Sequence, residues 1–166
     1  MNMKFKCSFW LVVFLGLSLT SCEGMDEAAI QHQPVIFESG EECHLCGMLI
    51  LKFEGPKGQA FVGGNSKVKK FCSTLDMFAW YFQPENKPNT QALFVHDMAQ
   101  NEWQLPDDTK LIDAKAAFYV VGSSKKGSMG KTFASFKHQE DAEAFIRDYS
   151  GEVKTFDQLS LELTMM

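Results

Sequence analysis

The chain has 166 residues, with 16 lysines and arginines against 21 aspartates and glutamates, and its formal net charge is −5. This acidic balance, without any basic run, argues against a nucleic-acid-binding surface, because phosphates repel acidic surfaces. The hydrophobic fraction of 45 % is ordinary for a globular protein.

The N-terminus has the layout of a secretory signal. Two lysines precede an apolar run over residues 9–19, and small residues follow. The run is too short to span a bilayer as a helix. The ending "LTSC" resembles the bacterial lipobox, which implies that residues 1–21 are a lipoprotein signal peptide and that Cys22 is lipidated. The alternative is an ordinary signal peptide that happens to end near a cysteine.

Cleavage before Cys22 would remove two lysines and no acidic residue, so the net charge of −5 would become −7. The 145 residues that remain fit one compact domain or two small ones packed together. Residues 22–40 form the lipid anchor and a polar tether. We therefore expect a periplasmic, membrane-anchored protein, and Glu23 does not decide between inner and outer membrane.

The number of cysteines in the mature chain limits the roles that their thiols can have. Of five cysteines, one leaves with the signal and one carries lipid, so Cys43, Cys46 and Cys72 remain. Three is an odd number, so in an oxidising compartment at least one must stay reduced, bind metal or pair between molecules. The odd number therefore argues against a purely structural disulfide framework.

The first half of the mature chain, residues 41–100, predicts a ββαβ unit that carries the metal site. Strands are expected at 48–53 and 59–64, joined by the turn "GPKG". A helix capped by Ser73 or Thr74 should end before Pro84, and a strand should follow at 92–99.

Residues 101–166 repeat this plan. Strands are predicted at 116–123 and 132–136, an amphipathic helix over 137–150 with Gly151 after its end, and a final strand at 152–159. The sequence therefore predicts an α+β protein made of two similar ββαβ units that share one core.

Cys43 and Cys46 form a C-x-x-C pair with three common uses. A structural zinc site would need four ligands, with Cys72 and a histidine completing the set, and would unfold without metal. A thiol-disulfide oxidoreductase would cycle Cys43 and Cys46, although such pairs normally begin a helix and this one precedes a predicted strand. The third use is a Cu(I) site, because Cu(I) prefers thiolate and thioether sulfur. Met48 would then lie beside Cys46 if the segment were extended.

Several other side chains have a functional and a structural interpretation. Met129, in the glycine-rich loop "KKGSMGK", is a candidate exposed thioether. His96 and Met98 share a face at a strand end, either as ligands or as ordinary edge-strand residues. Cys72 is expected in buried packing and His44 in a solvent-facing loop.

Motifs for catalysis are absent from the sequence. It contains no G-x-S-x-G, no H-E-x-x-H, no phosphate-binding loop and no dinucleotide fingerprint. Its acidic residues are spread along the chain rather than paired. The sequence therefore predicts a binding protein rather than an enzyme.

Five segments together carry a family resemblance: "CHLCGMLI", "GPKGQAFV", "FCSTLDMFAWY", "LIDAKAAFYVVGSSKKGSMG" and "FKHQEDAEAFIRDYSGEVKTFDQL". The chain resembles NosL, the accessory lipoproteins of nitrous-oxide reductase, over nearly its whole mature length. The resemblance implies a periplasmic Cu(I) chaperone that supplies copper for the copper–sulfide centre of that reductase. The implied partners are the apo-reductase, an ABC-type membrane assembly complex and the periplasmic component of that complex.

The same resemblance implies a fold and a ligand set. The fold would be two ββαβ units related in shape to organomercurial lyase. Cys46 would anchor Cu(I) as a thiolate, Met48 would be its thioether partner, and Met129 would be a third ligand. Cys43 would be an alternative ligand, or would oxidise with Cys46 and silence the site. His96 would be the candidate imidazole.

Overall fold

The computed structural model describes residues 31–63 and 67–166. The predicted signal peptide, the lipidation site Cys22 and most of the tether lie outside the described residues. Residues 31–166 form one compact unit. Within the described ranges, every helix is too short or too polar to cross a membrane.

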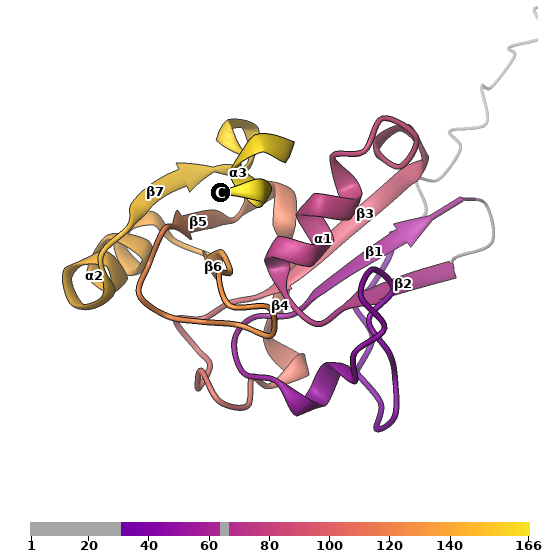
Figure 1. The fold of residues 1–166 in the computed structure, drawn as a ribbon, viewed down its shortest axis with the longest axis horizontal. Helices are drawn as coiled ribbons and strands as arrows, with labels where there is room; N and C mark the ends of the chain where they lie inside the picture. The colour runs from indigo at the N-terminus through magenta and orange to yellow at the C-terminus, as the bar shows by residue number, and fades with distance from the viewer. Residues whose placement is uncertain (1–30, 64–66) are drawn as a thin grey trace, which may run out of the picture. The chain divides into compact units, whose positions relative to one another are not determined.

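The first antiparallel sheet has the strand order β2-β1-β3-β4 (Figure 1). Its strands and the helix that joins β2 to β3 are β1 (Gly58–Val62), β2 (Lys67–Phe71), α1 (Thr74–Tyr81), β3 (Thr90–His96) and β4 (Leu111–Asp113). β4 comes from the second half of the chain but pairs with β3. The first sheet therefore extends beyond the predicted first unit.

The second antiparallel sheet has the order β6-β5-β7. Its elements are β5 (Phe118–Val121), β6 (Ala134–Phe136), α2 (Gln139–Tyr149) and β7 (Glu152–Thr155). In both sheets the first strand of the unit lies between the second and the third, and a helix connects the second to the third. This shared arrangement confirms two similar ββαβ units in an α+β protein.

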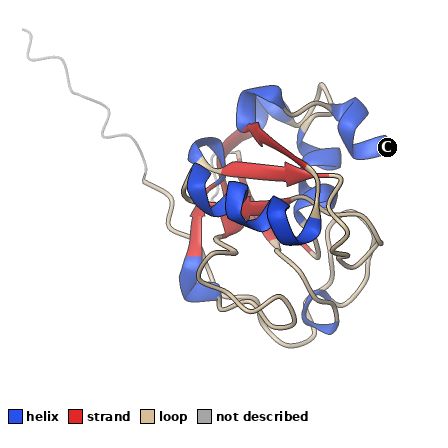
Figure 2. Cartoon of the chain, turned by 90° about the vertical axis from the view of Figure 1, so that its left-hand side faces the viewer, coloured by secondary structure: helices blue, strands red, loops and turns tan. Residues whose placement is uncertain are grey.

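Short helical segments complete the described chain. These are η1 (Ile50–Lys52), η2 (Lys87–Asn89), η3 (Asp108–Lys110), η4 (Ala114–Ala116), η5 (Phe156–Gln158) and α3 (Leu161–Met165). Figure 2 shows the helices packed around the strands.

The larger hydrophobic core draws on both units, as the sequence predicts. Phe78 of α1 packs edge-on against the buried Tyr119 ring of β5, with ring centroids 5.1 Å apart. The Tyr119 hydroxyl donates to the Ala114 carbonyl at 2.6 Å, so this polar group is satisfied inside the core. A smaller cluster under α2 includes Trp103, Phe136 and Phe145. Burial between the units therefore supplies hydrophobic stabilisation without any metal ion.

Both long helices begin and end where the sequence predicts. The Ser73 hydroxyl accepts a hydrogen bond from the Asp76 N–H at 3.0 Å, which caps α1. The helix stops at Phe82, shortly before Pro84. After α2, Gly151 adopts φ +110°, a conformation that residues with a Cβ rarely adopt.

The predicted strand at 48–53 is wrong, and β2 was missed. Residues 50–52 form η1, in which Ile50 is buried and Leu51 is exposed, and Leu49 just before η1 is also exposed. β1 pairs instead with β2, "KVKKF". The three lysines of β2 hide its strand pattern because the strand is only partly buried.

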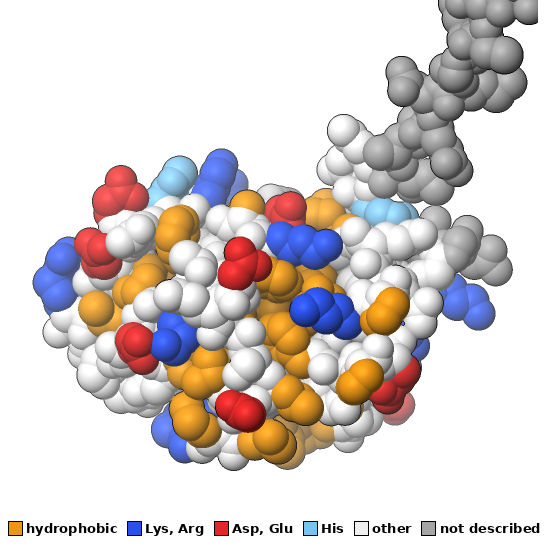
Figure 3. Space-filling view, turned by 90° about the horizontal axis from the view of Figure 1, so that it is seen from above, with side chains coloured by type: hydrophobic (Ala, Val, Ile, Leu, Met, Phe, Trp, Pro, Cys, Tyr) orange, Lys and Arg blue, Asp and Glu red, His pale blue; other side chains and the backbone are white. Residues whose placement is uncertain are grey.

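The surface carries mixed charges. Figure 3 shows acidic and basic side chains interspersed with apolar ones on the face in view. The exposed large apolar side chains include Leu45, Leu49 and Leu51, which lie in or just after the Cys43–Met48 segment.

Candidate metal centre

Three cysteines and one aspartate come together at one end of the first unit. The ligand atoms of Cys43, Cys46, Cys72 and Asp76 all lie within 4.8 Å of one another. All three cysteines are free thiols. Cys72 directly follows β2, and Asp76 lies in the first turn of α1. The site therefore forms where a loop, a strand end and a helix start meet.

The Cys43–Met48 segment is a tight loop, not the extended chain that would have set Met48 beside Cys46 on one face. The Cys43 N–H donates to the Met48 carbonyl at 2.8 Å, and the Gly47 N–H donates to the Cys43 carbonyl at 2.9 Å. Gly47 has φ +73°, which favours glycine at this turn. The His44 N–H donates to the Lys70 carbonyl of β2 at 2.8 Å, and this bond holds the loop beside Cys72.

The thiols are linked by short polar contacts. Cys46 Sγ lies 3.4 Å from Cys72 Sγ. Cys72 donates to Asp76 Oδ2 at 3.0 Å, and Cys43 donates to the same oxygen at 3.7 Å. Cys43, Cys72 and Asp76 are buried, whereas Cys46 is partly exposed. Cys46 is therefore the thiol that an incoming ion meets first.

The electrostatics of the cluster keep Cys46 and Cys72 protonated before a cation arrives. The contact with Cys72 lowers the pKa of Cys43, whereas the same contact, burial and the Asp76 carboxylate raise the pKa of Cys72. Burial also raises the pKa of Cys46. A cation that binds Cys46 and Cys72 must therefore displace their protons, so its affinity should rise with pH.

A loop of the second unit reaches the cluster. Ser128 Oγ donates to Cys72 Sγ at 2.9 Å. Ser128 and Met129 form the tip of a turn closed by a bridge between Gly127 and Gly130. Met129 is 58 % exposed, as expected for a thioether outside the core. The structure thus places the Met129 loop next to the candidate centre.

The base of this loop is fixed to the start of α1. Thr132 Oγ1 lies 3.1 Å from Thr74 Oγ1, and both residues are buried. A Cβ on Gly127 would lie 2.9 Å from Thr132 Cβ, so the close approach requires glycine. The position of Ser128 and Met129 is therefore set by contacts between the two units.

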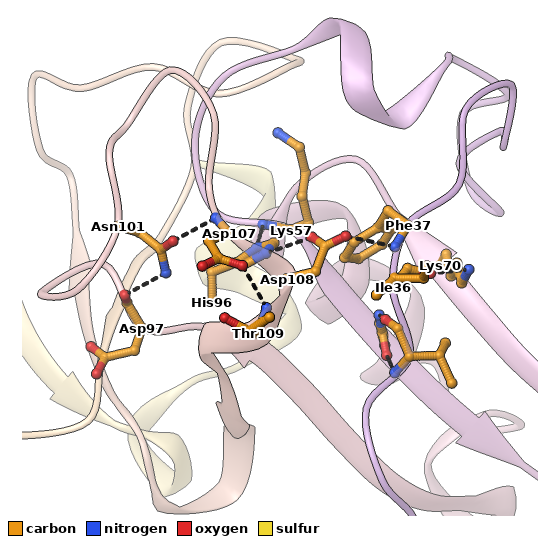
Figure 4. A network of polar contacts seen from close by, with 12 residues as sticks. Ile36, Phe37, Lys57, Lys70, His96, Asp97, Asn101, Asp107, Asp108 and Thr109 are labelled. Atoms are coloured by element: carbon orange, nitrogen blue, oxygen red, sulfur yellow. Dashed lines mark hydrogen bonds and ion pairs between the residues drawn. The ribbon is translucent and has the colours of Figure 1, made fainter.

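Met48 and His96 are placed differently. Met48 is partly buried and packs, with Cys46, against the main core cluster. His96 is fully buried at the end of β3. Its Nδ1 accepts from the Lys57 N–H at 3.0 Å and its Nε2 lies 3.1 Å from Asp108 Oδ1 (Figure 4). Burial lowers the pKa of His96. Both ring nitrogens are engaged, so we leave His96 out of the candidate centre.

The network around His96 has a structural role. Asp108 Oδ2 also accepts from the Phe37 N–H at 2.7 Å, which fixes the end of the tether (Figure 4). The buried Lys57 ammonium donates to the carbonyls of Phe53, Glu54 and Gly55 at 2.6–3.0 Å. The network therefore ties the segment after the metal loop to β3.

Two members of the cluster, Cys72 and Asp76, were not foreseen as copper ligands, although Cys72 was named for the zinc alternative. Cys72 is buried, as the sequence predicts, but its Sγ also lies 3.4 Å from Cys46 Sγ. Asp76 follows Cys72 by four residues, a spacing that brings side chains together at a helix start. His44 is exposed as expected, with Nε2 2.8 Å from Lys69 Nζ.

The donor set suits a soft or borderline metal ion. Thiolates select Cu(I) and zinc, and a carboxylate is an acceptable zinc ligand. The family model of NosL matches residues 34–164. The chain belongs to the NosL family.

The NosL relatives cover most of the chain. The copper-binding lipoprotein NosL of Stutzerimonas stutzeri is 46 % identical over 153 residues, which span 92 % of this chain and 80 % of that protein. The copper-binding lipoprotein NosL of Achromobacter cycloclastes is 36 % identical over 154 residues, which span 91 % of this chain and 79 % of that protein. Both names describe binding proteins rather than enzymes.

A solved NosL structure shares the fold. The crystal structure of the copper chaperone NosL from Shewanella denitrificans has a TM-score of 0.77 and 45 % sequence identity, and the match covers 78 % of this chain and 97 % of that one. The predicted α+β fold is thereby confirmed. The relation in shape to organomercurial lyase stays a prediction.

Proposed function

We propose that this NosL protein carries Cu(I) as its cargo and delivers it for assembly of the copper–sulfide centre of nitrous-oxide reductase. One observation carries the proposal: three cysteine sulfurs and a carboxylate oxygen lie within 4.8 Å of one another, with Cys46 at the surface. Thiolate and thioether sulfur are soft donors, and among the oxidation states of copper they favour Cu(I). The copper-binding names of the relatives support this choice.

In this proposal Cys46 is the entry thiolate. Cys72, at 3.4 Å, supplies a second sulfur, and the Met48 and Met129 thioethers complete the coordination as the ion is bound or passed on. Cu(I) tolerates low coordination numbers, so two thiolates suffice to hold it. Cys43 and Asp76 then form the buried side of the site.

The exposure of one side suits transfer to another protein. An acceptor ligand can approach Cys46 and Met129 from solvent, while Cys72 still holds the ion from within. Copper would therefore move by ligand exchange rather than by dissociation into water. A site that is open to solvent on one side is what we expect of a copper carrier, since a closed four-ligand site would release its ion slowly.

The location and the partners are part of the proposal. A lipid on Cys22 would hold the protein at a membrane facing the periplasm, in keeping with the lipoprotein names of its relatives. The acceptors would be the apo-reductase, the ABC-type membrane assembly complex and its periplasmic component.

A zinc-stabilised binding module is the second candidate. Three thiols and a carboxylate make a four-ligand set, with Asp76 in the place that the sequence analysis gave to a histidine. In that case the protein would prefer Zn(II) and would lose its fold when a chelator removes the ion. The core shared by the two units favours the copper proposal, because it does not depend on a metal ion.

An anaerobic Cu(I) titration of the mature lipoprotein tests the proposal, with a chromophoric Cu(I) chelator as competitor. We expect one tightly bound Cu(I) per chain, and affinity losses of at least about tenfold in Cys46→Ser and Cys72→Ser. Met129→Leu should weaken binding, whereas Met165→Leu, at the equally exposed Met165, is the matched control. Preferential binding of Zn(II), with unfolding on chelation, would replace the copper proposal by the zinc module.

A further inference from the structure

We propose that Cys46 and Cys72 form a reversible disulfide that closes the metal site under oxidising conditions. Their sulfurs are 3.4 Å apart, across the gap between the metal loop and the start of α1. A disulfide bond is about 2.05 Å long, so a total approach of about 1.4 Å is enough to form it. The proposed disulfide therefore joins Cys46 to Cys72, which is 26 residues away in the chain, and not to Cys43, its C-x-x-C neighbour.

The contacts of Cys43 explain why it is left out. Cys43 is 3 % exposed, and its Sγ donates to Asp76 Oδ2. Its backbone N–H and carbonyl are both used within the loop, by Met48 and Gly47. A Cys43–Cys46 bond would have to turn the Cys43 side chain away from Asp76. Cys46 has no such restraint on its partly exposed side chain.

Two contacts hold the Cys72 sulfur in place beside Cys46. Ser128 Oγ donates to Cys72 Sγ at 2.9 Å, and Asp76 accepts the thiol proton at 3.0 Å. Both contacts restrain the sulfur at its position 3.4 Å from Cys46 Sγ.

The reaction is thiol–disulfide exchange with an oxidant of the disulfide class. The partly exposed Cys46, as a thiolate, attacks one sulfur of the oxidant and releases its other sulfur as a thiolate, which takes up the proton lost by Cys46. Cys72 then gives its proton to the hydrogen-bonded Asp76 carboxylate, attacks Cys46 Sγ and displaces the second oxidant sulfur as a thiolate, which takes up that proton. Two protein thiols are oxidised by two electrons, and one disulfide is reduced to two thiols.

The consequence for copper rests on the proposed function. A metal ion binds the thiolate, so the disulfide removes two ligands from the site at once. Cys43 remains as a single reduced thiol beside Asp76. Bound Cu(I) would in turn protect Cys46 and Cys72 from oxidation. The protein would then carry copper only when its site is reduced.

Peptide mapping of the metal-free mature lipoprotein tests this inference. The protein is equilibrated with mixtures of reduced and oxidised glutathione, the remaining thiols are alkylated, and tryptic peptides are weighed. Cys43 and Cys46 share one tryptic peptide, and Cys72 lies in another. We expect the two peptides to be linked in the wild type and equally in Cys43→Ser. In Cys72→Ser, intramolecular oxidation should require a glutathione mixture at least about tenfold more oxidising.

Two outcomes would overturn the inference. One is an internally bonded Cys43–Cys46 peptide in the wild type, and the other is loss of the inter-peptide link in Cys43→Ser. One equivalent of Cu(I) separates this inference from the proposed function. If the link forms as fast with Cu(I) as without it, the copper proposal fails and the disulfide stands. If Cu(I) binds tightly but no link forms, the disulfide fails alone.

Discussion

Replacing Ser128 by alanine removes a hydrogen bond that joins the second unit to the candidate metal centre. Ser128 Oγ donates to Cys72 Sγ at 2.9 Å. In the loaded site Cys72 would be a thiolate, and a hydrogen bond to a charged group contributes about 1.5–3 kcal/mol. Since about 1.4 kcal/mol is a factor of ten in a binding constant, the full range corresponds to a roughly 10- to 150-fold loss of Cu(I) affinity.

The partial exposure of Ser128 sets the value within this range. Water can reach the space left by the hydroxyl and restore part of the lost hydrogen bond. We therefore expect the lower end, about a tenfold loss. Fold stability should change by less than about 1 kcal/mol, because Ser128 lies at the tip of a loop.

The assay is competition for Cu(I) against a chromophoric chelator, with urea unfolding measured on the same samples. Ser124→Ala is the matched control, because Ser124 is an exposed serine of the same connection between β5 and β6. An unchanged affinity in Ser128→Ala would mean that Cys72 does not bind the ion. The ligand set would then reduce to Cys46 and the methionines.

Three further predictions concern the scaffold around the centre. Ser73→Ala removes the cap that holds Asp76 and should lower the free energy of unfolding by about 1–2 kcal/mol in urea titrations, and an unchanged value would contradict the cap. Burial lowers the pKa of Lys57 from 10.5 to about 8, so between these pH values the unfolded chain binds more protons. Stability of the wild type relative to Lys57→Met should therefore rise by up to about 3 kcal/mol from pH 8 to 10.5, and a flat or falling difference in thermal or urea unfolding would refute the burial effect. His96→Gln should lower the free energy of unfolding by about 1–3 kcal/mol, because Asp108 or the Lys57 N–H loses a hydrogen-bond partner. The Cu(I) affinity measured in the chelator assay should stay unchanged. A weaker affinity in a variant that is equally folded would return His96 to the ligand set.

The fold was predictable where local signals agree with burial. The Ser73 cap and Pro84 bound α1, and Gly151 ends α2. The prediction of a strand at 48–53 was wrong because this apolar run belongs to a loop and a short helical turn. Two backbone hydrogen bonds within the Cys43–Met48 loop decide this conformation, and no periodicity reveals them.

The candidate site was predictable only in part for a related reason. The C-x-x-C spacing identifies Cys43 and Cys46 as candidate metal ligands. From the sequence alone, Cys72 is interpreted as a buried core residue. Its role as a ligand becomes visible only when β2 is known to lie beside the Cys43–Met48 loop, which it contacts through the hydrogen bond from the His44 N–H to the Lys70 carbonyl. Asp76 is visible only once Cys72 is placed at a helix start. Such contacts depend on tertiary structure, which the spacing of residues in one chain does not encode.

The coordination of Cu(I) in the loaded protein tests the central claim most directly. X-ray absorption at the copper edge reports the type and number of ligand atoms around the ion. We predict a first shell with at least two sulfur atoms and no imidazole signature, and one sulfur fewer in Cys72→Ser. An imidazole in the shell, or a sulfur count that Cys72→Ser leaves unchanged, would contradict the proposed centre.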